Sequence, residues 1–177
     1  MTELVVAHTG QLDAAALRAG RDLLQDVFAG ELTEDDWEHC LGGLHALLWE
    51  DGELIGHAAL IQRRLLHGGR SLRTGYIEGV GVRADRRRRG YGATVMEVLE
   101  QVARRAYDVA ALGATDEAAV FYESRGWRLW QGPTSALTPD GVVRTEEEDD
   151  CIYVLPLSAP LDLHGALTCD WRNGDAW

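Results

Sequence analysis

The chain of 177 residues contains no lysine, so its 17 basic residues are all arginine. They are outnumbered by 29 acidic residues, and the formal net charge at pH 7 is −12. A protein of this charge repels nucleic acids and anionic membrane surfaces, and we expect neither of them as a partner. The same charge attracts polycations.

Cysteine is scarce as well. Cys40, Cys151 and Cys169 are odd in number and far apart, which argues against a disulfide framework or a thiolate zinc site and favours a reducing, cytoplasmic location. The six histidines show no metal-ligand spacing, so we expect no bound metal. No apolar run approaches the roughly 20 residues that span a bilayer, and the N-terminal residues lack the pattern of a signal peptide.

The patterns that are present alternate between strand and helix. Strands are predicted at Glu3–Ala7, Leu44–Glu50, Glu53–His67, Ser71–Val82, Val109–Leu112, Trp127–Gln131 and Cys151–Leu157. Helices are predicted at Leu12–Phe28, after an N-cap at Thr33, at Tyr91–Tyr107 and at Asp116–Arg125. Asp51-Gly52 predicts a hairpin turn. Because no repeat or linker interrupts the chain, we expect one domain over residues 1–177 with a mixed α/β (α+β) fold.

The most informative segment is Val80–Ala93, with the sequence VGVRADRRRRGYGA, which joins a predicted strand to a predicted helix. Its glycines let backbone N–H groups approach an anion closely, and the start of a helix adds partial positive charge. This chemistry suits a pyrophosphate, although the GxxxxGK[ST] pattern of a P-loop is absent. The alternative is a solvated run of arginines that ends where a helix begins.

A second segment, Ala118–Trp127 (AAVFYESRGW), favours the pyrophosphate. Arg87, Gly90 and Gly92 match the [R/Q]xxGx[G/A] signature of the GNAT N-acetyltransferases, and the second segment resembles the later helix and strand of that superfamily at the matching spacing. The resemblance implies the GNAT acyl-CoA N-acyltransferase fold, a splayed mixed sheet flanked by helices, with acetyl-CoA as the acetyl donor.

Over nearly the whole chain the sequence resembles the aminoglycoside 2'-N-acetyltransferases. The resemblance is carried by FAGELTEDDWEHCLGGLHALLWEDG, HAALIQRRLLHGG, GYIEGVGVRAD, YESRGWRLWQGPTSALTP and LTCDWRNGDAW. It implies a homodimeric enzyme that moves acetyl from acetyl-CoA to the 2'-amine of a polycationic aminoglycoside. Two alternatives stay open: a GNAT enzyme for another amine, such as a cell-wall sugar or a metabolite, and a non-catalytic acyl-CoA-binding regulatory module.

The resemblance also implies the residues that bind acetyl-CoA and perform the chemistry. The backbone of Val80, Gly81 and Val82 would hold the pantetheine arm. The pyrophosphate would be bound, mainly through backbone N–H groups, by Arg87, Arg88, Arg89, Gly90, Tyr91 and Gly92. Tyr122 would protonate the departing thiolate, because a tyrosine pKa of about 10 exceeds that of a thiol, about 8.5. Glu78 would act as a general base through water. The alternatives are a core tyrosine and a structural or binding carboxylate.

Carboxylates around the acceptor amine complete what the resemblance implies. The acceptor site would consist of Glu31, Asp36, Glu78, Gly79, Gly113, Glu147, Glu148, Asp175 and Trp177. Trp177 would also take part in catalysis, through its terminal carboxylate. The alternatives are a solvated acidic loop at Thr145–Asp150 and a tail that only packs through its tryptophans. Gly113 stands where the family pattern has serine, and Glu31 and Glu148 stand where it has aspartate, which concerns substrate preference more than reaction type.

Overall fold

The computed structural model describes residues 1–177 as two compact units that share one pair of strands. The first unit comprises Met1–Ile61 and Ile77–Val102, and the second comprises Gln62–Tyr76 and Ala103–Trp177. Strands β3 (Glu53–His67) and β4 (Arg70–Val82) contribute residues to both units. The expected single domain over residues 1–177 stays a prediction.

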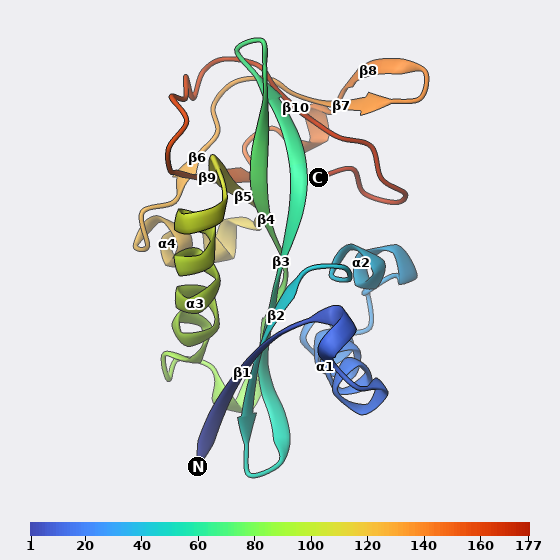
Figure 1. Cartoon of the computed structure of the whole chain (residues 1–177), viewed down its shortest axis with the longest axis vertical. Coiled ribbons are helices and arrows are strands. Elements are labelled where there is room, and N and C mark those ends of the chain that lie inside the picture. Colours follow the sequence, from blue (N-terminus) through green and yellow to red (C-terminus); the bar gives the residue numbers. More distant parts are fainter. The chain divides into compact units, whose positions relative to one another are not determined.

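The first unit combines an antiparallel sheet with helices on both of its faces (Figure 1). Besides its parts of β3 and β4, it contains β1 (Thr2–His8), α1 (Ala14–Val27), α2 (Glu34–His39), β2 (Leu44–Glu50) and most of α3 (Tyr91–Ala106). β2 pairs antiparallel with β1 and with β3. The turn between β2 and β3 has positive φ at Asp51 and Gly52, as the Asp-Gly pair predicted.

Local sequence signals fix where the first two helices begin. Asp13 caps α1 by accepting a hydrogen bond from the Ala16 N–H, and Thr33 and Asp36 form a reciprocal capping box at α2. Two apolar clusters then attach these helices to the sheet. One is built on Leu23, Leu47 and Leu54, and the other on Leu24, Cys40 and Ala59.

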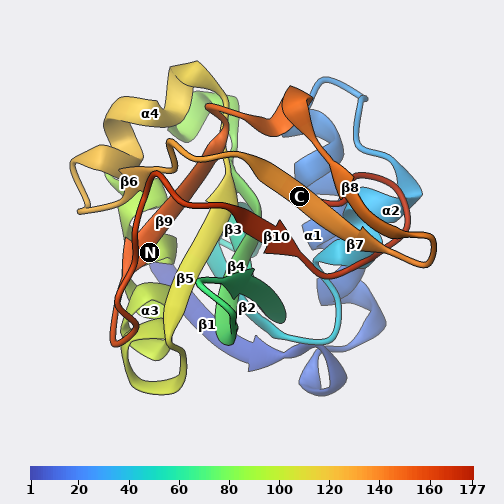
Figure 2. The same cartoon turned by 90° about the horizontal axis from the view of Figure 1, so that it is seen from above.

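The second unit is a mixed sheet with one short helix. Its elements besides β3 and β4 are β5 (Val109–Gly113), α4 (Asp116–Glu123), β6 (Arg128–Leu129), β7 (Thr134–Thr138), β8 (Gly141–Arg144), β9 (Ile152–Pro156) and β10 (Leu167–Cys169). The strand order is β6-β9-β5-β4-β3-β10-β7-β8 (Figure 2). β4 pairs parallel with β5 and β10 pairs parallel with β7, whereas β9 is antiparallel to its neighbours. The mixed α/β fold class is thereby confirmed.

The main departures from the predicted elements fall in this unit. The strand predicted at Trp127–Gln131 is reduced to the two residues of β6, because the Gln131 N–H bonds to the Leu163 carbonyl instead of continuing the ladder. β10 was not predicted at all. It is three residues long, and its partners in β3 and β7 are distant in sequence. None of the helices is long and apolar enough to cross a membrane.

Tryptophans fill the core of the second unit. Trp130 is 1% exposed and packs in one cluster with Tyr76, Val109 and Trp177. Its indole N–H donates to the Gly165 carbonyl over 3.0 Å. This bond draws two loops together so closely that a Cβ at Gly132 would lie 1.9 Å from the Gly165 carbonyl oxygen. Only glycine fits at position 132.

We therefore expect Gly132→Ala to lower the free energy of unfolding by about 1–3 kcal/mol, because backbone atoms must move to admit the methyl group. Gly113→Ala is the matched control, since the nearest atom to its Cβ would be 3.8 Å away. Urea denaturation followed by tryptophan fluorescence measures both. Equal unfolding midpoints for the two variants would contradict the close approach at Gly132.

Candidate active site

Glu78 and Gly79 lie where β4 departs from regular pairing. The β4–β5 ladder covers only Thr74–Tyr76, so both residues follow its last pair. Gly79 has φ of +56°, and a Cβ there would lie 2.7 Å from the Cys40 sulfur and 2.9 Å from Cδ1 of Leu24. A left-handed glycine interrupts the alternation of a strand. The predicted sites Glu78, Gly79 and Val80–Val82 thus occupy a bulged stretch of strand rather than a regular one.

The loop before α3 has the geometry of an anion site. Arg88 and Gly90 have positive φ values of 60° and 84°, which turn the chain sharply into the helix. The Thr94 N–H donates to the Gly90 carbonyl over 3.0 Å, and the N–H groups of Tyr91, Gly92 and Ala93, one turn earlier, have no acceptor within the helix. Arg87, Arg88 and Arg89 are exposed beside them. These groups suit a pyrophosphate.

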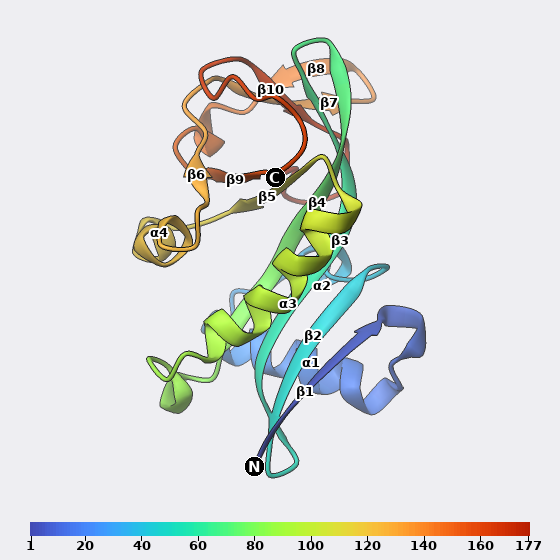
Figure 3. The same ribbon diagram turned by 60° about the vertical axis from the view of Figure 1, so that its left-hand side comes forward.

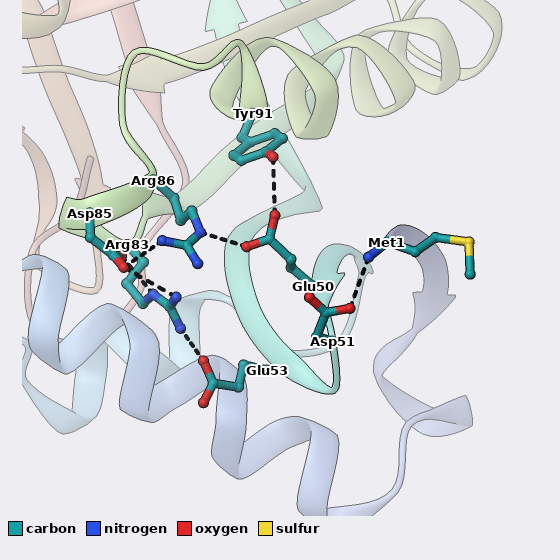
Figure 4. A network of polar contacts seen from close by, with 8 residues as sticks. All are labelled: Met1, Glu50, Asp51, Glu53, Arg83, Asp85, Arg86 and Tyr91. Atoms are coloured by element: carbon teal, nitrogen blue, oxygen red, sulfur yellow. Dashed lines mark hydrogen bonds and ion pairs between the residues drawn. The ribbon is translucent and has the colours of Figure 1, made fainter.

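A polar network that the sequence did not predict holds this loop (Figure 4). Arg86 Nε donates to Glu50 over 2.5 Å, and the Tyr91 hydroxyl donates to the same carboxylate over 3.3 Å. The hydrogen bond from Arg86 is the main reason that the pKa of Glu50 is lowered. Asp85 accepts from both Arg86 and Arg83. The side chains of Arg86 and Tyr91 are therefore engaged within the protein, and the predicted role of Tyr91 falls to its backbone N–H.

Of the first two predicted acceptor-site carboxylates, Asp36 lies in the first turn of α2 and Glu31 lies just before this helix. The Asp36 carboxylate accepts from the Thr33 N–H over 2.9 Å, so one of its oxygens is engaged in capping the helix. Glu31 is exposed, and its N–H donates to the Phe28 carbonyl over 3.0 Å. Its position is therefore set by the end of α1.

Helix α4 of the second unit is labelled in Figure 3. It contains Tyr122, which is only 6% exposed. Its ring packs between Phe121, Trp127 and Tyr153, with ring centroids 5.1, 6.1 and 6.3 Å away. Aromatic neighbours on several sides fix the ring in one orientation. Such fixation is what a residue with a positioned hydroxyl requires, and it is equally what a core tyrosine shows.

The C-terminal residues are anchored firmly. The Trp177 indole N–H donates to the Thr145 hydroxyl over 2.9 Å, and its backbone N–H donates to the Asp175 carboxylate over 3.0 Å. Arg172 donates to the backbone oxygens of Asp175 and Trp177. Trp177 is 5% exposed. The structure therefore brings together Asp175, Trp177 and Thr145, the first residue of the acidic segment.

Two arginines that the sequence analysis missed support this tail. Arg63 is 4% exposed and donates to the Asp170 carboxylate over 2.8 Å and to the Ala176 carbonyl over 2.6 Å. Arg63 and Arg172 both stack on the Tyr76 ring, 4.7 and 5.4 Å from its centroid. Arg63 and Asp170 are separated by 107 positions, so no local pattern could have linked them.

Two carboxylates of the acidic segment, Asp149 and Glu148, have pKa values that are shifted in opposite directions. Asp149 accepts from Arg144 and Thr134, and its pKa is lowered to about 2, chiefly by the bond from Arg144. Glu148 behaves in the opposite way. Burial raises its pKa, and the nearby charges of Asp175 and Glu147 raise it further. The nearby Arg172 lowers this pKa, so a protein cation already offsets part of the negative charge around Glu148.

Gly113 ends β5 in an exposed position. The nearest atom to a Cβ there would be the Tyr76 hydroxyl oxygen, 3.8 Å away. A serine at this position would meet no steric obstacle. The departure from the expected serine thus follows from no packing constraint.

Comparisons with known proteins agree with this geometry. A family model described as an acetyltransferase (GNAT) domain matches residues 11–130. A curated aminoglycoside 2'-N-acetyltransferase of Mycolicibacterium fortuitum is 48% identical over 176 residues, which cover 97% of this chain and 90% of the relative. Among solved structures, Escherichia coli ElaA aligns with a TM-score of 0.61 at 24% identity, covering 87% of this chain and 99% of that one. An acyl-CoA N-acyltransferase of Pseudomonas aeruginosa aligns with a TM-score of 0.63 at 19% identity and the same coverage.

The network around Glu50 leads to a first prediction for this site. Glu50→Ala removes the acceptor that holds Arg86 and Tyr91, so the loop before α3 should lose its fixed shape. We expect the Kd for acetyl-CoA to rise roughly five-fold, a modest change because the ion pair lies near the surface. Isothermal titration measures it. Asp51→Asn, which removes only an exposed partner of the N-terminal amine, should leave the Kd unchanged. An unchanged Kd in Glu50→Ala would show that the network does not shape the loop.

The raised pKa of Glu148 leads to a second prediction. The pKa of Glu148 is higher in the folded state than in the unfolded state. Its contribution to stability is therefore fully present below the unfolded-state pKa and is lost as the pH rises through the folded-state pKa. Glu148→Gln should therefore raise Tm at neutral pH by about 1–3 °C. It should also raise KM for a polycationic acceptor roughly five-fold, because about 1 kcal/mol of attraction is lost. Glu146→Gln, on an exposed side chain, is the control that should change neither. A lower Tm in Glu148→Gln would contradict the electrostatic account.

Proposed function

The chain belongs to the GNAT acetyltransferases and, within them, to the aminoglycoside 2'-N-acetyltransferases, and from this premise we propose that it acetylates the 2'-amine of aminoglycosides. The observation that carries the choice of substrate is the pair formed by Glu148 and Asp175. Burial and the charges of Asp175 and Glu147 raise the pKa of Glu148, and an ammonium-rich sugar adds positive charge to that of Arg172, which lowers this pKa.

Acetyl-CoA, the donor of the GNAT family, supplies a thioester that an amine attacks directly. The N–H groups of Tyr91 and Gly92 at the start of α3 bind its pyrophosphate, helped by the exposed Arg87–Arg89. The bulged strand at Val80–Val82 presents backbone groups to the pantetheine arm. This division follows from the chemistry of the two segments, because exposed helix N–H groups suit an anion and strand edges suit an amide chain.

The proton transfers fall to two side chains. Glu78 accepts the proton of the attacking amine through water. Tyr122 donates a proton to the departing thiolate, which leaves as the thiol. In this mechanism the nitrogen first bonds to the acetyl carbon and gives a tetrahedral intermediate. The carbon–sulfur bond of this intermediate then breaks, and no acyl-enzyme is needed. A backbone N–H of the bulged strand stabilises the oxyanion that forms on the acetyl carbonyl.

Several finer assignments belong to the same proposal. Glu31, Asp36 and Glu147 extend the acceptor site, and Trp177 contributes through its backbone oxygen beside Arg172. We also propose a homodimer, a role in antibiotic resistance and a cytoplasmic location. The three free cysteines support the last of these, since a reducing compartment keeps thiols free.

A panel of acceptors tests the proposed function. The chain is assayed with acetyl-CoA and matched aminoglycosides that carry either an amine or a hydroxyl at the 2' position, and the product is located by NMR. We expect acetylation at the 2' nitrogen and no turnover of the 2'-hydroxy compounds. Equal turnover of both would assign the acetyl group to another amine. A kcat/KM higher on cell-wall amino sugars would make aminoglycosides a side reaction, and no turnover of any amine would favour a regulatory acyl-CoA-binding module.

Tyr122→Phe tests the general acid. We expect kcat to fall about 100-fold, within the usual range for a positioned proton donor, while the Kd for acetyl-CoA changes less than about two-fold. Tyr107→Phe serves as the control, because Tyr107 directly follows α3 and lies outside the proposed site. Pre-steady-state mixing ensures that chemistry, not product release, is measured. An unchanged chemical rate would remove Tyr122 from the mechanism and leave it as a core residue.

A further inference from the structure

A chain of hydrogen bonds crosses the first unit and ends on the bulged strand. The Gly42 N–H lies 2.9 Å from the Thr9 hydroxyl oxygen, which lies 2.8 Å from Nε2 of His45. Nδ1 of His45 lies 3.0 Å from Nε2 of His57. Nδ1 of His57 lies 2.7 Å from the Gly79 carbonyl oxygen. Both histidine rings are buried, with exposures of 1% and 0%.

Chemistry fixes the direction of every bond in this chain. A carbonyl oxygen only accepts, so Nδ1 of His57 carries a hydrogen. In a neutral ring Nε2 of His57 is then the acceptor, and Nδ1 of His45 must donate to it. By the same logic Nε2 of His45 accepts from the Thr9 hydroxyl. The competing acceptor for that hydroxyl, the Gly43 carbonyl, is farther away at 3.4 Å. All the hydrogens therefore point toward Gly79.

The direction holds only while both rings are neutral. Burial lowers the pKa of His45 and of His57 to about 4 in each case. His8, next to Thr9, lowers the pKa of His45 further, and His45 does the same to His57. The Trp37 ring of α2 packs 6.4 and 6.1 Å from the two imidazoles, and the Cys40 thiol lies beside Gly79. At neutral pH the chain is therefore made of uncharged groups.

The chain orients a peptide group and does not conduct a proton. A proton relay would have to continue beyond Gly79, but a peptide carbonyl passes no proton on. What the last bond fixes is the plane of the Gly79–Val80 peptide. In a trans peptide the C=O and N–H point in opposite directions. With the Gly79 carbonyl aimed at His57, the Val80 N–H points away from His57.

We propose that His57, held in one tautomer by His45 and Thr9, is a positioning residue that aims the Val80 N–H at the thioester carbonyl of the acetyl donor. This inference rests on the proposed acetyl transfer. Gly79 has a left-handed φ and follows the last residue of the β4–β5 ladder, so pairing with β5 does not fix its peptide planes. The buried donor of His57 supplies the restraint. The histidines thus act on the rate of the chemical step through a backbone group, without touching the substrate.

The tautomers are measured on the wild-type chain. Histidine-selective ¹⁵N NMR at pH 7 should show hydrogen on Nδ1 and none on Nε2 in both His45 and His57, and both rings should stay neutral down to about pH 5. The free amino acid prefers the opposite tautomer, so the result is specific to this chain of bonds. Hydrogen on Nε2 of either ring would overturn the proposal. This measurement needs neither substrate nor a variant that folds.

Two substitutions separate positioning from packing. His57→Phe fills the site without a donor, whereas the amide of His57→Asn places a donor near the original Nδ1. We expect His57→Phe to lower kcat about 10- to 100-fold, as for a misaligned oxyanion donor, with KM for acetyl-CoA within about three-fold of wild type. His57→Asn should recover most of the lost kcat. His67→Phe is the matched control, because His67 also bonds to a backbone carbonyl, that of Ala166, but in the second unit.

The outcomes distinguish the failure of this inference from that of the proposed function. If the wild-type chain does not acetylate 2'-amino sugars, the proposed function is wrong. The tautomers of His45 and His57 can still be measured by NMR in that case. If the wild type is active, two results contradict the positioning role. One is a kcat of His57→Phe equal to that of wild type, and the other is an equal loss of kcat in His57→Asn and His57→Phe. If His57→Phe does not fold, Thr9→Val is used in its place. This variant removes the hydroxyl that donates to His45, and its kcat is measured. A kcat equal to wild type would then count against the proposal.

Discussion

The left-handed turn at Gly79 is the constraint on which the proposed chemistry depends. Neighbouring atoms of Leu24 and Cys40 leave no room for a Cβ, and the carbonyl is bound to a buried imidazole. Strand β4 continues to Val82, but its backbone is left-handed at this one residue. Its ladder with β5 ends at Tyr76, so the residues after Gly79 are not paired with β5. The proposed binding edge for the acetyl donor lies in this part of β4.

In both units some charged side chains form ion pairs within the protein. We propose that other charged side chains in the same segments bind ligands. In the arginine run, Arg86 is held by Glu50, whereas Arg88 and Arg89 stay exposed next to the start of α3. In the acidic segment, Asp149 is held by Arg144, whereas Glu148 is left near Asp175. The paired members fix the shape of each loop. In the proposed function, the others attract the pyrophosphate at one site and the polycationic acceptor at the other.

The sequence predicted what depends on local chemistry. The hairpin at Asp51-Gly52, the N-cap at Thr33 and the loop before α3 each follow from a few adjacent residues, and all three are found. Long-range contacts were missed. β10 has no pattern of its own, and Arg63 bonds to a residue 107 positions away. In the β2–β3 register Leu47 lies opposite His57, so His45 and His57 lie on the same face of the sheet. Their final hydrogen-bond acceptor, the Gly79 carbonyl oxygen of β4, could be found only from the structure.

The central claim is that a backbone N–H of the bulged strand polarises the acetyl group. The most direct measurement is the infrared stretch of the thioester carbonyl in acetyl-CoA labelled with ¹³C at that carbon. Difference spectra against unlabelled acetyl-CoA isolate this band when it is bound to the protein. A hydrogen bond to the carbonyl weakens its double bond, so the account predicts a lower frequency in the complex than in water. A band at the same or a higher frequency would mean that no protein donor reaches the carbonyl, and the account would be wrong.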